Sequence, residues 1–329
     1  MIKAGLVGLG GISKVHLDAY RDLEGVTLVA AADVQGEGAP RSSEAKELGA
    51  KIYNSIDEML ASEDLDMIDV CTPTPRHKEM VIKGLERGLH VISEKPMSRT
   101  YDDCAELVAL AEKCKTNYMV AHVVRFMKPY AYLRSLVESG ELGKPVHIIM
   151  RRISAVPRWS YQDWLIDTKE SGGVPLDLSI HDIDFIYSVF GEPRDVRATY
   201  RSYRGKEGFG ANDYISSELI YDDMSVSVIG AQYNADPAFA AEFSAFFENG
   251  MLELKGGKVY KCGEEISLEE EKIGEATGIN ISSSSAYTDE IAYFVDCIEN
   301  GKKPEFITPA SSAGSVKLIE RLMASAIKI

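Results

Sequence analysis

An aspartate and a histidine lie four residues apart in the segment Ser171–Asp182, which opens with Gly172-Gly173 after its first serine. In a helix this spacing places Asp177 and His181 on one face. A histidine beside a carboxylate is a usable general base, because the carboxylate favours the imidazolium that forms when the ring takes a hydroxyl proton. The same pair on a surface would contribute little energy, and the spacing alone leaves both interpretations open.

A second candidate for chemistry is the lysine of the tripeptide Glu94-Lys95-Pro96. A residue before proline is held out of the helical region, so we expect Lys95 in an extended turn at the end of a strand. From there its ammonium group would hydrogen-bond a substrate oxygen and stabilise charge that develops there during a reaction. The alternative is a solvated surface lysine.

A glycine-rich turn, Gly8–Ser13, follows the first apolar run and opens a helical pattern. Gly8 and Gly10 let the backbone turn tightly and approach a pyrophosphate, which then lies at the N-terminus of the helix. Ser13 occupies the third fingerprint position in place of glycine. Asp33 ends the next apolar run about twenty residues on, where its carboxylate can accept hydrogen bonds from ribose hydroxyls. This context predicts a dinucleotide site.

The type of dinucleotide also depends on Asp33. Its carboxylate repels the 2′-phosphate of NADP, and the following Val34-Gln35 offers no cation, so the sequence predicts NAD over NADP. Arg41 lies further along and has the reach to swing in. Thr72 and Pro73 belong to a turn that could line the cofactor. The alternative is that this turn has a purely structural role. The other residues predicted to contact the cofactor are Gly11, Ile12, Thr72, Pro73, His77, Glu94 and Lys95.

Both tryptophans of the chain, Trp159 and Trp164, lie in the segment Val156–Trp164. Aromatic faces with neighbouring hydrogen-bonding groups suit a polyhydroxylated ring, which has apolar C–H faces and a polar rim. Arg125 is a third candidate substrate contact, since it lies where the chain crosses between two predicted domains. Ordinary loop packing of the tryptophans and a bracing role for Arg125 are the alternatives.

The first third of the chain alternates apolar runs with helical patterns, which is typical of a parallel sheet covered on both faces in a doubly wound α/β domain. The predicted strands are Ile2–Val7, Val26–Ala32, Met67–Cys71, Leu89–Ser93 and Tyr118–Ala121. The predicted helices are His16–Leu23, Ile56–Leu60, His77–Arg87 and Tyr101–Lys113. The pattern stops near His122, so we place the first domain at 1–122 and the second at 123–329.

The second domain carries hairpin signals instead. Asn249-Gly250, Gly256-Gly257 and Asp222-Asp223 each separate two β-rich runs and predict a meandering antiparallel sheet. The predicted helices are Pro129–Glu138, Asp177–Phe190, Tyr287–Asn300 and Ala310–Ala326. Gly205–Gly210 and Ser282–Ser285 are predicted to be loops.

Composition excludes several classes of protein. The 329 residues suffice for two domains, and 36 basic against 51 acidic side chains give a net charge of −15, which disfavours binding to nucleic acid or to a membrane surface. Five scattered cysteines without a CxxC pair argue against disulfides and zinc and for a reducing cytoplasm. A metal site of Asp177, His181, Asp182 and Asp184 is disfavoured, because only two of them share one helix face.

Four motifs occur together and in order: Gly8–Ser13, Glu94-Lys95-Pro96, Ser139–Pro145, and Gly172-Gly173 leading to Asp177 and His181-Asp182. In these the chain resembles the Gfo/Idh/MocA oxidoreductases over essentially its whole length. The resemblance implies an N-terminal Rossmann domain and a C-terminal α/β domain with a large, open, mainly antiparallel sheet. The open face usually serves homodimer or homotetramer contacts.

The resemblance also implies roles for three residues. His181 takes a hydroxyl proton while hydride leaves the same carbon for nicotinamide, Asp177 orients His181, and Lys95 anchors the reacting oxygen. We therefore expect an NAD-dependent oxidoreductase that acts on a secondary alcohol or ketone of a sugar, inositol or related polyol. The alternatives are a redox-neutral enzyme that oxidises its substrate transiently and a non-catalytic dinucleotide sensor.

Overall fold

The computed structural model describes residues 1–202, 213–233, 239–268 and 285–329, and these residues divide into two compact units. The first unit comprises residues 1–122 and 286–316, and the second comprises 123–285 and 317–329. The sequence predicted one crossing between domains, after residue 122. In the structure the chain returns to the first unit at residue 286 and leaves it again within the helix α10 (Pro309–Ser325).

The first unit is built on a sheet of six parallel strands in the order β3-β2-β1-β4-β5-β6. This order confirms the predicted Rossmann sheet. The strands are β1 (Ile2–Val7), β2 (Val26–Ala32), β3 (Lys51–Tyr53), β4 (Met67–Val70), β5 (His90–Glu94) and β6 (Tyr118–Ala121). The strands β1 and β4 are almost completely buried, because helices cover both faces of the sheet.

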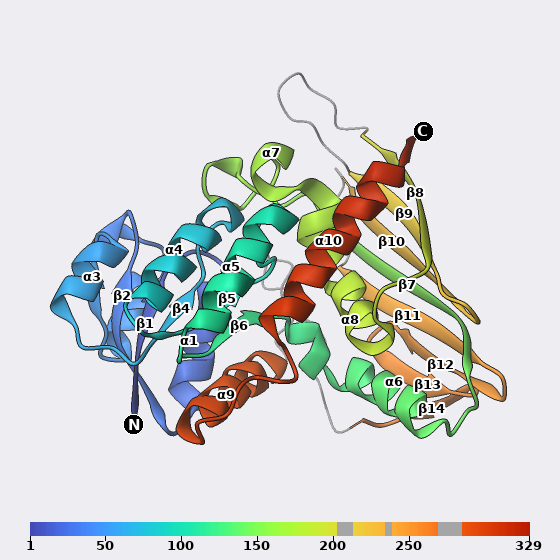
Figure 1. Ribbon diagram of the computed structural model, residues 1–329, viewed down its shortest axis with the longest axis horizontal. Coiled ribbons are helices and arrows are strands. Elements are labelled where there is room, and N and C mark those ends of the chain that lie inside the picture. Colours follow the sequence, from blue (N-terminus) through green and yellow to red (C-terminus); the bar gives the residue numbers. More distant parts are fainter. Residues whose placement is uncertain (203–212, 234–238, 269–284) are drawn as a thin grey trace. The chain divides into compact units, whose positions relative to one another are not determined.

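The helices of the first unit are α1 (Ser13–Asp22), α2 (Ser42–Glu47), α3 (Ile56–Ser62), α4 (Thr74–Glu86), α5 (Tyr101–Lys113) and α9 (Ala286–Glu299), with a short 3₁₀ turn at Gly36–Gly38. The crossovers β1-α1-β2 and β4-α4-β5 run in opposite directions along the sheet, so right-handedness puts α1 and α4 on opposite faces. Helix α5 packs beside α4, and α9 packs beside α1 (Figure 1).

The segment from α9 onward joins the first unit through an apolar face and through hydrogen bonds from side chains to backbone carbonyls. Ile291 and Phe294 of α9 are buried. The Asn117 side-chain amide donates to the Lys302 carbonyl at 2.7 Å, and Lys303 Nζ donates to the Thr116 carbonyl at 2.9 Å. These contacts join residues about 185 positions apart, so the local sequence pattern that gave the domain boundary at residue 122 could not predict them.

The second unit is built on a nine-stranded sheet in the order β14-β13-β12-β11-β7-β10-β9-β8-β15. All its pairings are antiparallel except β7 with β10 and β8 with β15. The strands are β7 (Pro145–Ala155), β8 (Asp195–Arg201), β9 (Tyr214–Ile220), β10 (Ser225–Tyr233), β11 (Ala240–Phe247), β12 (Gly250–Lys255), β13 (Lys258–Lys261), β14 (Glu264–Ile266) and β15 (Ile327–Lys328). The predicted mainly antiparallel sheet is confirmed.

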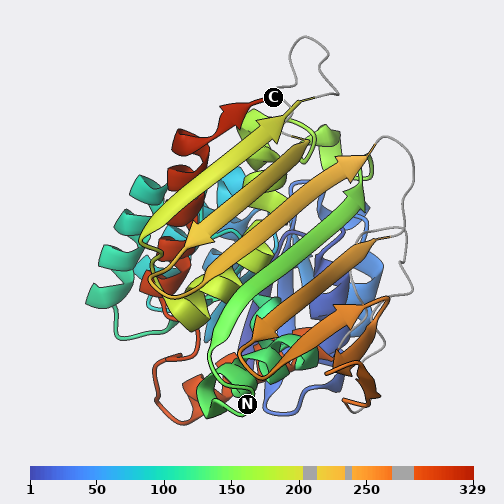
Figure 2. The same ribbon diagram turned by 90° about the vertical axis from the view of Figure 1, so that its right-hand side faces the viewer.

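Helices cover one face of this sheet, and no described helix covers the face turned to the viewer in Figure 2. The helices are α6 (Lys128–Ser139), α7 (Thr168–Ser171), α8 (Ile180–Phe190) and α10 (Pro309–Ser325), with short turns at Val123–Phe126, Tyr161–Asp163 and Val174–Leu178. Tyr130 of α6 packs edge-on against Phe185 of α8 and Phe243 of β11, with ring centroids 5.1 and 5.3 Å apart. These rings join the helical layer to the sheet.

Two details of the predicted elements differ from the structure. The hairpin between β11 and β12 turns at Glu248-Asn249, because Phe247 already pairs with Gly250. The predicted helix Asp177–Phe190 is a π-helical turn over Val174–Leu178 followed by α8. The short elements β3 and α2 carried no periodic signal and were not predicted.

The predicted loop at Gly205–Gly210 lies outside the described residues, as do residues 282–284 of the loop predicted at Ser282–Ser285. Within the described part of the chain, no helix combines the length and the hydropathy that crossing a membrane requires.

Candidate functional site

The glycine turn lies between β1 and α1, at the carboxyl end of the parallel sheet, where such sheets bind ligands. Gly8 has φ +97°, and a Cβ atom there would lie 2.7 Å from the Cys71 carbonyl oxygen. Glycine at this position therefore follows from the fold itself. Gly10 differs, since a Cβ there would meet no atom within 4 Å and its φ is not positive. The space beside Gly10 is available to a ligand.

The start of α1 fits an anion. Ile12 at its N-cap makes no side-chain capping hydrogen bond, and the first turn contains no acidic residue. The backbone N–H groups and the positive end of the helix dipole are the usual binding groups for a pyrophosphate. Gly10, Gly11 and Ile12 are partly exposed, as contact with a cofactor requires. Ser13 is buried and its hydroxyl donates to the Gly10 carbonyl at 2.7 Å, which explains why serine is accepted at the third fingerprint position.

Asp33 lies at the end of β2 next to this turn. Its Oδ2 accepts from the Leu9 N–H at 2.9 Å and its Oδ1 from the Gln35 N–H at 2.8 Å, so both oxygens are held in place with acceptor capacity to spare. The side chain is partly exposed. Arg41, the one nearby cation that the sequence offered for a 2′-phosphate, donates to Glu44 at 2.8 Å.

Lys95 directly follows β5 at the same edge of the sheet, and its peptide bond to Pro96 is cis. Every residue from Val91 to Ser98 is buried except Lys95, which is partly exposed. A charged side chain that leaves an otherwise buried segment is available to a ligand. Thr72 and Pro73, which follow β4, are partly exposed as well.

Two residues predicted to contact the cofactor are buried instead. His77 Nε2 lies 2.8 Å from the Thr72 carbonyl and Nδ1 lies 2.8 Å from the Pro96 carbonyl, so the ring joins two turns and offers no nitrogen to a dinucleotide. Burial lowers the pKa of His77, and its bonds to the two carbonyls oppose this only in part. Glu94 is also buried, with one oxygen toward His16 and the other accepting from the Lys95 N–H at 3.0 Å.

A buried cluster behind Lys95 was missed by sequence reasoning. His16 of α1 is fully buried, with Nδ1 2.7 Å from Asp69 Oδ2 and Nε2 3.2 Å from Glu94 Oε1. Tyr20 donates to the same Asp69 oxygen at 3.0 Å, and the Cys71 thiol lies 3.7 Å from the other. The available signal was a histidine and a tyrosine four apart on a helix, together with Asp69 and Glu94 near the ends of two strands.

Charge in this cluster is balanced by His16. Burial is the largest single influence and by itself lowers the pKa of the imidazole, but the charges and hydrogen bonds of Asp69 and Cys71 together outweigh it, and the pKa of His16 is well above its usual value. Burial by itself raises the pKa of Glu94, whereas His16, Lys95 and His77 together lower it by more, so that carboxyl is ionised more readily than usual. Burial raises the pKa of the Cys71 thiol, which stays protonated.

The ligand atoms of His16, Asp69 and Cys71 lie within 4.8 Å of one another, a spacing that would suit a metal ion. The short bond between His16 and Asp69 occupies two of those atoms, and the thiol is protonated. We interpret the cluster as a hydrogen-bonded network of charges.

Asp177 and His181 lie in the second unit, where helix and turn meet. Asp177 belongs to the π-helical turn Val174–Leu178 and His181 to the first turn of α8, so the expected single α-helical face is replaced by a wider turn. Single π-helical turns occur frequently at functional sites. From Gly173 to Ile186 every residue is buried except Asp177 and His181, which are partly exposed.

The buried residues beside them form two bidentate ion pairs. Arg125 donates from Nε and Nη2 to Asp184 at 2.8 and 2.7 Å, and Arg152 donates to Asp182 at 3.0 and 2.8 Å. All four are buried, so Arg125 braces the inside of the second unit and is not exposed to a substrate. Neither Asp182 nor Asp184 is available as a metal ligand, because each carboxylate holds an arginine.

The aromatic segment lies on the surface of the second unit. Trp159 is 42% exposed and Trp164 is partly exposed. Gln162 and Asp163 between them both have positive φ, 51° and 57°. Two consecutive non-glycine residues in this region are uncommon and indicate a tightly turned loop.

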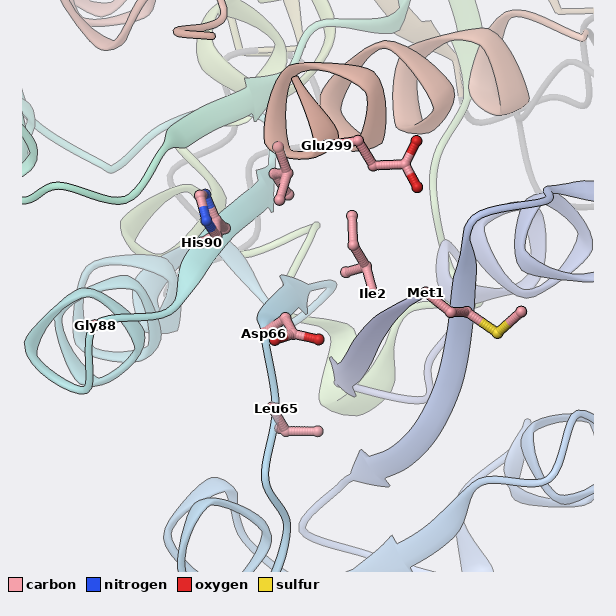
Figure 3. Close-up of a pocket in the computed structure, with 8 residues that line it drawn as sticks. Met1, Ile2, Leu65, Asp66, Gly88, His90 and Glu299 are labelled. Atoms are coloured by element: carbon pink, nitrogen blue, oxygen red, sulfur yellow. The ribbon is translucent and has the colours of Figure 1, made fainter. Parts of the chain in front are cut away.

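A surface pocket of about 400 Å³ lies elsewhere on the first unit (Figure 3). Its lining residues are Met1, Ile2, Leu65, Asp66, Gly88, His90, Ile298 and Glu299. Ile2 and His90 begin β1 and β5, so the pocket lies at the amino ends of the strands, opposite the edge that carries the glycine turn. It is not the dinucleotide site.

The fold and the glycine turn define a Rossmann-type dinucleotide-binding protein. Residues 2–122 match the family described as "Oxidoreductase family, NAD-binding Rossmann fold", and residues 130–253 match the GFO/IDH/MocA C-terminal domain. The chain belongs to the Gfo/Idh/MocA oxidoreductase family.

Characterised relatives differ in their reactions. The chain is 28% identical to inositol 2-dehydrogenase of Rhizobium meliloti over an alignment of 334 positions, gaps included. This alignment covers 96% of this chain and 94% of the relative. It is 30% identical to 2,7-anhydro-N-acetylneuraminate hydratase of Mediterraneibacter gnavus over 227 residues, 68% of this chain and 58% of the relative. The chain spans about three fifths of the length of several curated relatives that it matches.

Solved structures show the same fold. The scyllo-inositol dehydrogenase of Lactobacillus casei, with bound NAD(H) and scyllo-inositol, superposes with a TM-score of 0.79. Its sequence is 23% identical, and the match covers 99% of this chain and 97% of that one.

Proposed function

We propose that this protein is an NAD-dependent dehydrogenase that transfers hydride between nicotinamide and a secondary alcohol or ketone of a sugar, inositol or related polyol. The observation that carries the proposal is the exposure pattern of Asp177 and His181, an acid–base pair that alone leaves a buried segment. The whole-length relative named inositol 2-dehydrogenase supports this class of substrate.

In the proposed mechanism bound NAD supplies the hydride acceptor. His181 takes the proton of the substrate hydroxyl, and Asp177 orients the ring and stabilises its charged form. Lys95 donates a hydrogen bond to the reacting oxygen, whose negative charge grows as the proton leaves. Trp159 and Trp164 offer apolar faces to the C–H groups of the ring.

NAD is proposed over NADP because of Asp33. Its fixed carboxylate accepts hydrogen bonds from ribose hydroxyls and repels a 2′-phosphate. The ion pair of Arg41 with Glu44 supports this choice, since it engages the cation that a 2′-phosphate would need.

The test is nicotinamide reduction across a panel of inositols, aldoses, polyols and sugar acids, with NAD and NADP in parallel and His181→Ala as the control. We expect absorbance at the reduced-nicotinamide band with at least one substrate, higher rates with NAD, and loss of the signal in the variant. A signal that persists in His181→Ala contradicts the assigned general base. In Lys95→Ala, turnover should disappear while NADH still binds.

A redox-neutral reaction is the second candidate, and the relative named a hydratase favours it. A hydratase adds or removes water without net oxidation. For this candidate, mass spectrometry would detect product while the nicotinamide absorbance stays constant, and NAD would remain bound through purification.

We also propose that the protein forms a homodimer or homotetramer through the uncovered face of the nine-stranded sheet. Ile149 of β7 and Phe246 of β11 are 37% and 38% exposed and lie diagonally on that face, since Phe246 pairs with His147. Sedimentation velocity on the chain and on Phe246→Glu tests this, and a monomeric wild type overturns it.

A further inference from the structure

The protonation of His16 follows from its geometry. One ring nitrogen faces the Asp69 carboxylate at 2.7 Å and the other faces the Glu94 carboxylate at 3.2 Å. An ionised carboxylate only accepts hydrogen bonds, so both contacts are made together when each ring nitrogen carries a proton, which agrees with the raised pKa of His16. His16 is therefore a buried imidazolium between two buried anions.

The Glu94 side of this arrangement leads to Lys95. Glu94 Oε1 faces His16, while Glu94 Oε2 accepts from the backbone N–H of Lys95 at 3.0 Å. One carboxylate thus connects an imidazolium on α1 to the backbone of the residue that leaves the buried segment after β5. Tyr20 lies on the far side of the cluster, where its hydroxyl donates to Asp69.

We propose that His16 is a positioning residue, which fixes the Glu94 carboxylate and through it the backbone of Lys95. Its catalytic consequence rests on the role proposed above for Lys95. The physical reason is electrostatic. Without a cation between them, Asp69 and Glu94 are two buried anions, and such groups either take up a proton or turn toward water. In both cases Glu94 loses the orientation in which it accepts from Lys95.

Two substitutions of His16 separate charge from shape. In His16→Asn the amide nitrogen takes the approximate place of Nδ1 and keeps a donor for Asp69, but nothing reaches Glu94. In His16→Gln the longer side chain brings a donor toward Glu94. Tyr20→Phe is the matched control, because it removes a hydrogen bond from the same cluster without touching Glu94.

The primary measurement is hydrogen exchange of the Lys95 backbone amide in the full chain, resolved by fragmentation mass spectrometry. We expect exchange to accelerate by about tenfold or more in His16→Asn, by less in His16→Gln, and by no more than about twofold in Tyr20→Phe. Unchanged exchange in His16→Asn overturns the proposal, and so does equal acceleration in Tyr20→Phe, which would indicate general loosening of the cluster.

If His16→Asn does not fold, Glu94→Gln tests the same link from its other end. Its neutral amide no longer attracts the imidazolium, so Lys95 exchange should rise, and unchanged exchange overturns the proposal. The kinetic readout comes second: kcat should fall about tenfold in His16→Asn while the Kd for NADH stays within about threefold. A wild type without dehydrogenase activity would contradict the proposed function only, because the exchange result judges the role of His16 by itself.

Discussion

Each unit contains buried carboxylates close in the chain to its partly exposed candidate site residues, but the cations that neutralise these carboxylates differ between the two units. In the first unit Asp69 and Glu94 share one histidine, and in the second Asp182 and Asp184 each hold an arginine through two hydrogen bonds. Arginine stays charged at every pH that proteins encounter, and its planar fork matches a carboxylate. Histidine carries its charge only while the surrounding anions keep its pKa high.

The two units therefore contain two kinds of buried ion pair, one with a cation that keeps its charge at every ordinary pH and one with a cation that titrates. The Arg152 pair joins β7 to α8 and the Arg125 pair joins the turn Val123–Phe126 to α8, and neither arginine titrates in the usual pH range. The histidine cluster lies behind Lys95 and changes its charge with pH. Substitutions that test this difference are expected to have their largest effects on the free energy of unfolding and their smallest on the preference between NAD and NADP.

The largest effect is expected at Arg152. Arg152→Ala leaves Asp182 buried without its bidentate partner and should lower the free energy of unfolding by about 3–5 kcal/mol. The adjacent Arg151 is the matched control, because its side chain is 49% exposed and pairs with Glu242 on the surface, where a pair contributes about 0–1 kcal/mol. Urea unfolding followed by circular dichroism measures both. Equal losses in the two variants would contradict the distinction between buried and surface pairs.

The next effect concerns the pH dependence of His16. A raised folded-state pKa stabilises the fold fully below the unfolded value of 6.5, and this stabilisation is lost as the pH rises through the raised pKa. The lowered pKa of Glu94 stabilises the fold above its unfolded value of 4.5 and is lost as the pH falls. His16→Asn should therefore cost about 3 kcal/mol between these two values and less as the pH rises above 6.5.

The same unfolding series on Arg152→Ala should give a loss that does not shrink as the pH rises above 6.5, because arginine does not titrate there and the unpaired Asp182 carboxyl takes up a proton only as the pH falls. Parallel pH profiles for the two variants would mean that His16 does not carry a titrating charge.

A third prediction concerns the uncharged glycine turn and separates a glycine that the fold requires from a glycine that the ligand requires. Gly8→Ala should lower stability by about 1–3 kcal/mol, since the new Cβ meets the Cys71 carbonyl at a positive φ. Gly10→Ala should leave stability within about 0.5 kcal/mol and weaken NADH binding by about tenfold or more, since its Cβ enters the space left for the ligand. Thermal unfolding and calorimetric titration with NADH measure the two effects. Full NADH affinity in Gly10→Ala would remove this position from the dinucleotide site.

The smallest effect is expected at Asp33. Asp33→Ala should weaken NAD binding by about tenfold, the equivalent of one hydrogen bond to a charged group, and should weaken NADP less because the repulsion of its phosphate disappears. Asp33→Asn keeps an acceptor for the Leu9 N–H and separates the loss of charge from loosening of the turn. An unchanged preference in both variants would rule out the assignment to the ribose.

The periodic elements were predictable because their signals are local. Apolar runs with glycine-rich turns located β1, β2 and β6 to the residue, and the glycine pairs located the hairpins to within one position. The three-residue strand β3 was not predictable, since a strand that short has no period to detect. The π-helical turn at Asp177 was not predictable either, because the spacing of Asp177 and His181 fits a regular α-helix.

Among the site residues, sequence alone determined which side chains follow the strands of the first unit, because parallel strands bring their carboxyl ends to one edge. That placed Gly10, Asp33 and Lys95 at the same end of the sheet. Burial was decided only by the tertiary structure, which turned His77 and Arg125 inward and left Asp177 and His181 partly exposed. The His16 cluster belongs to this second class. Its members come from one helix and two strands and lie up to 78 positions apart in the sequence, and only the packed sheet brings their charges within hydrogen-bond distance.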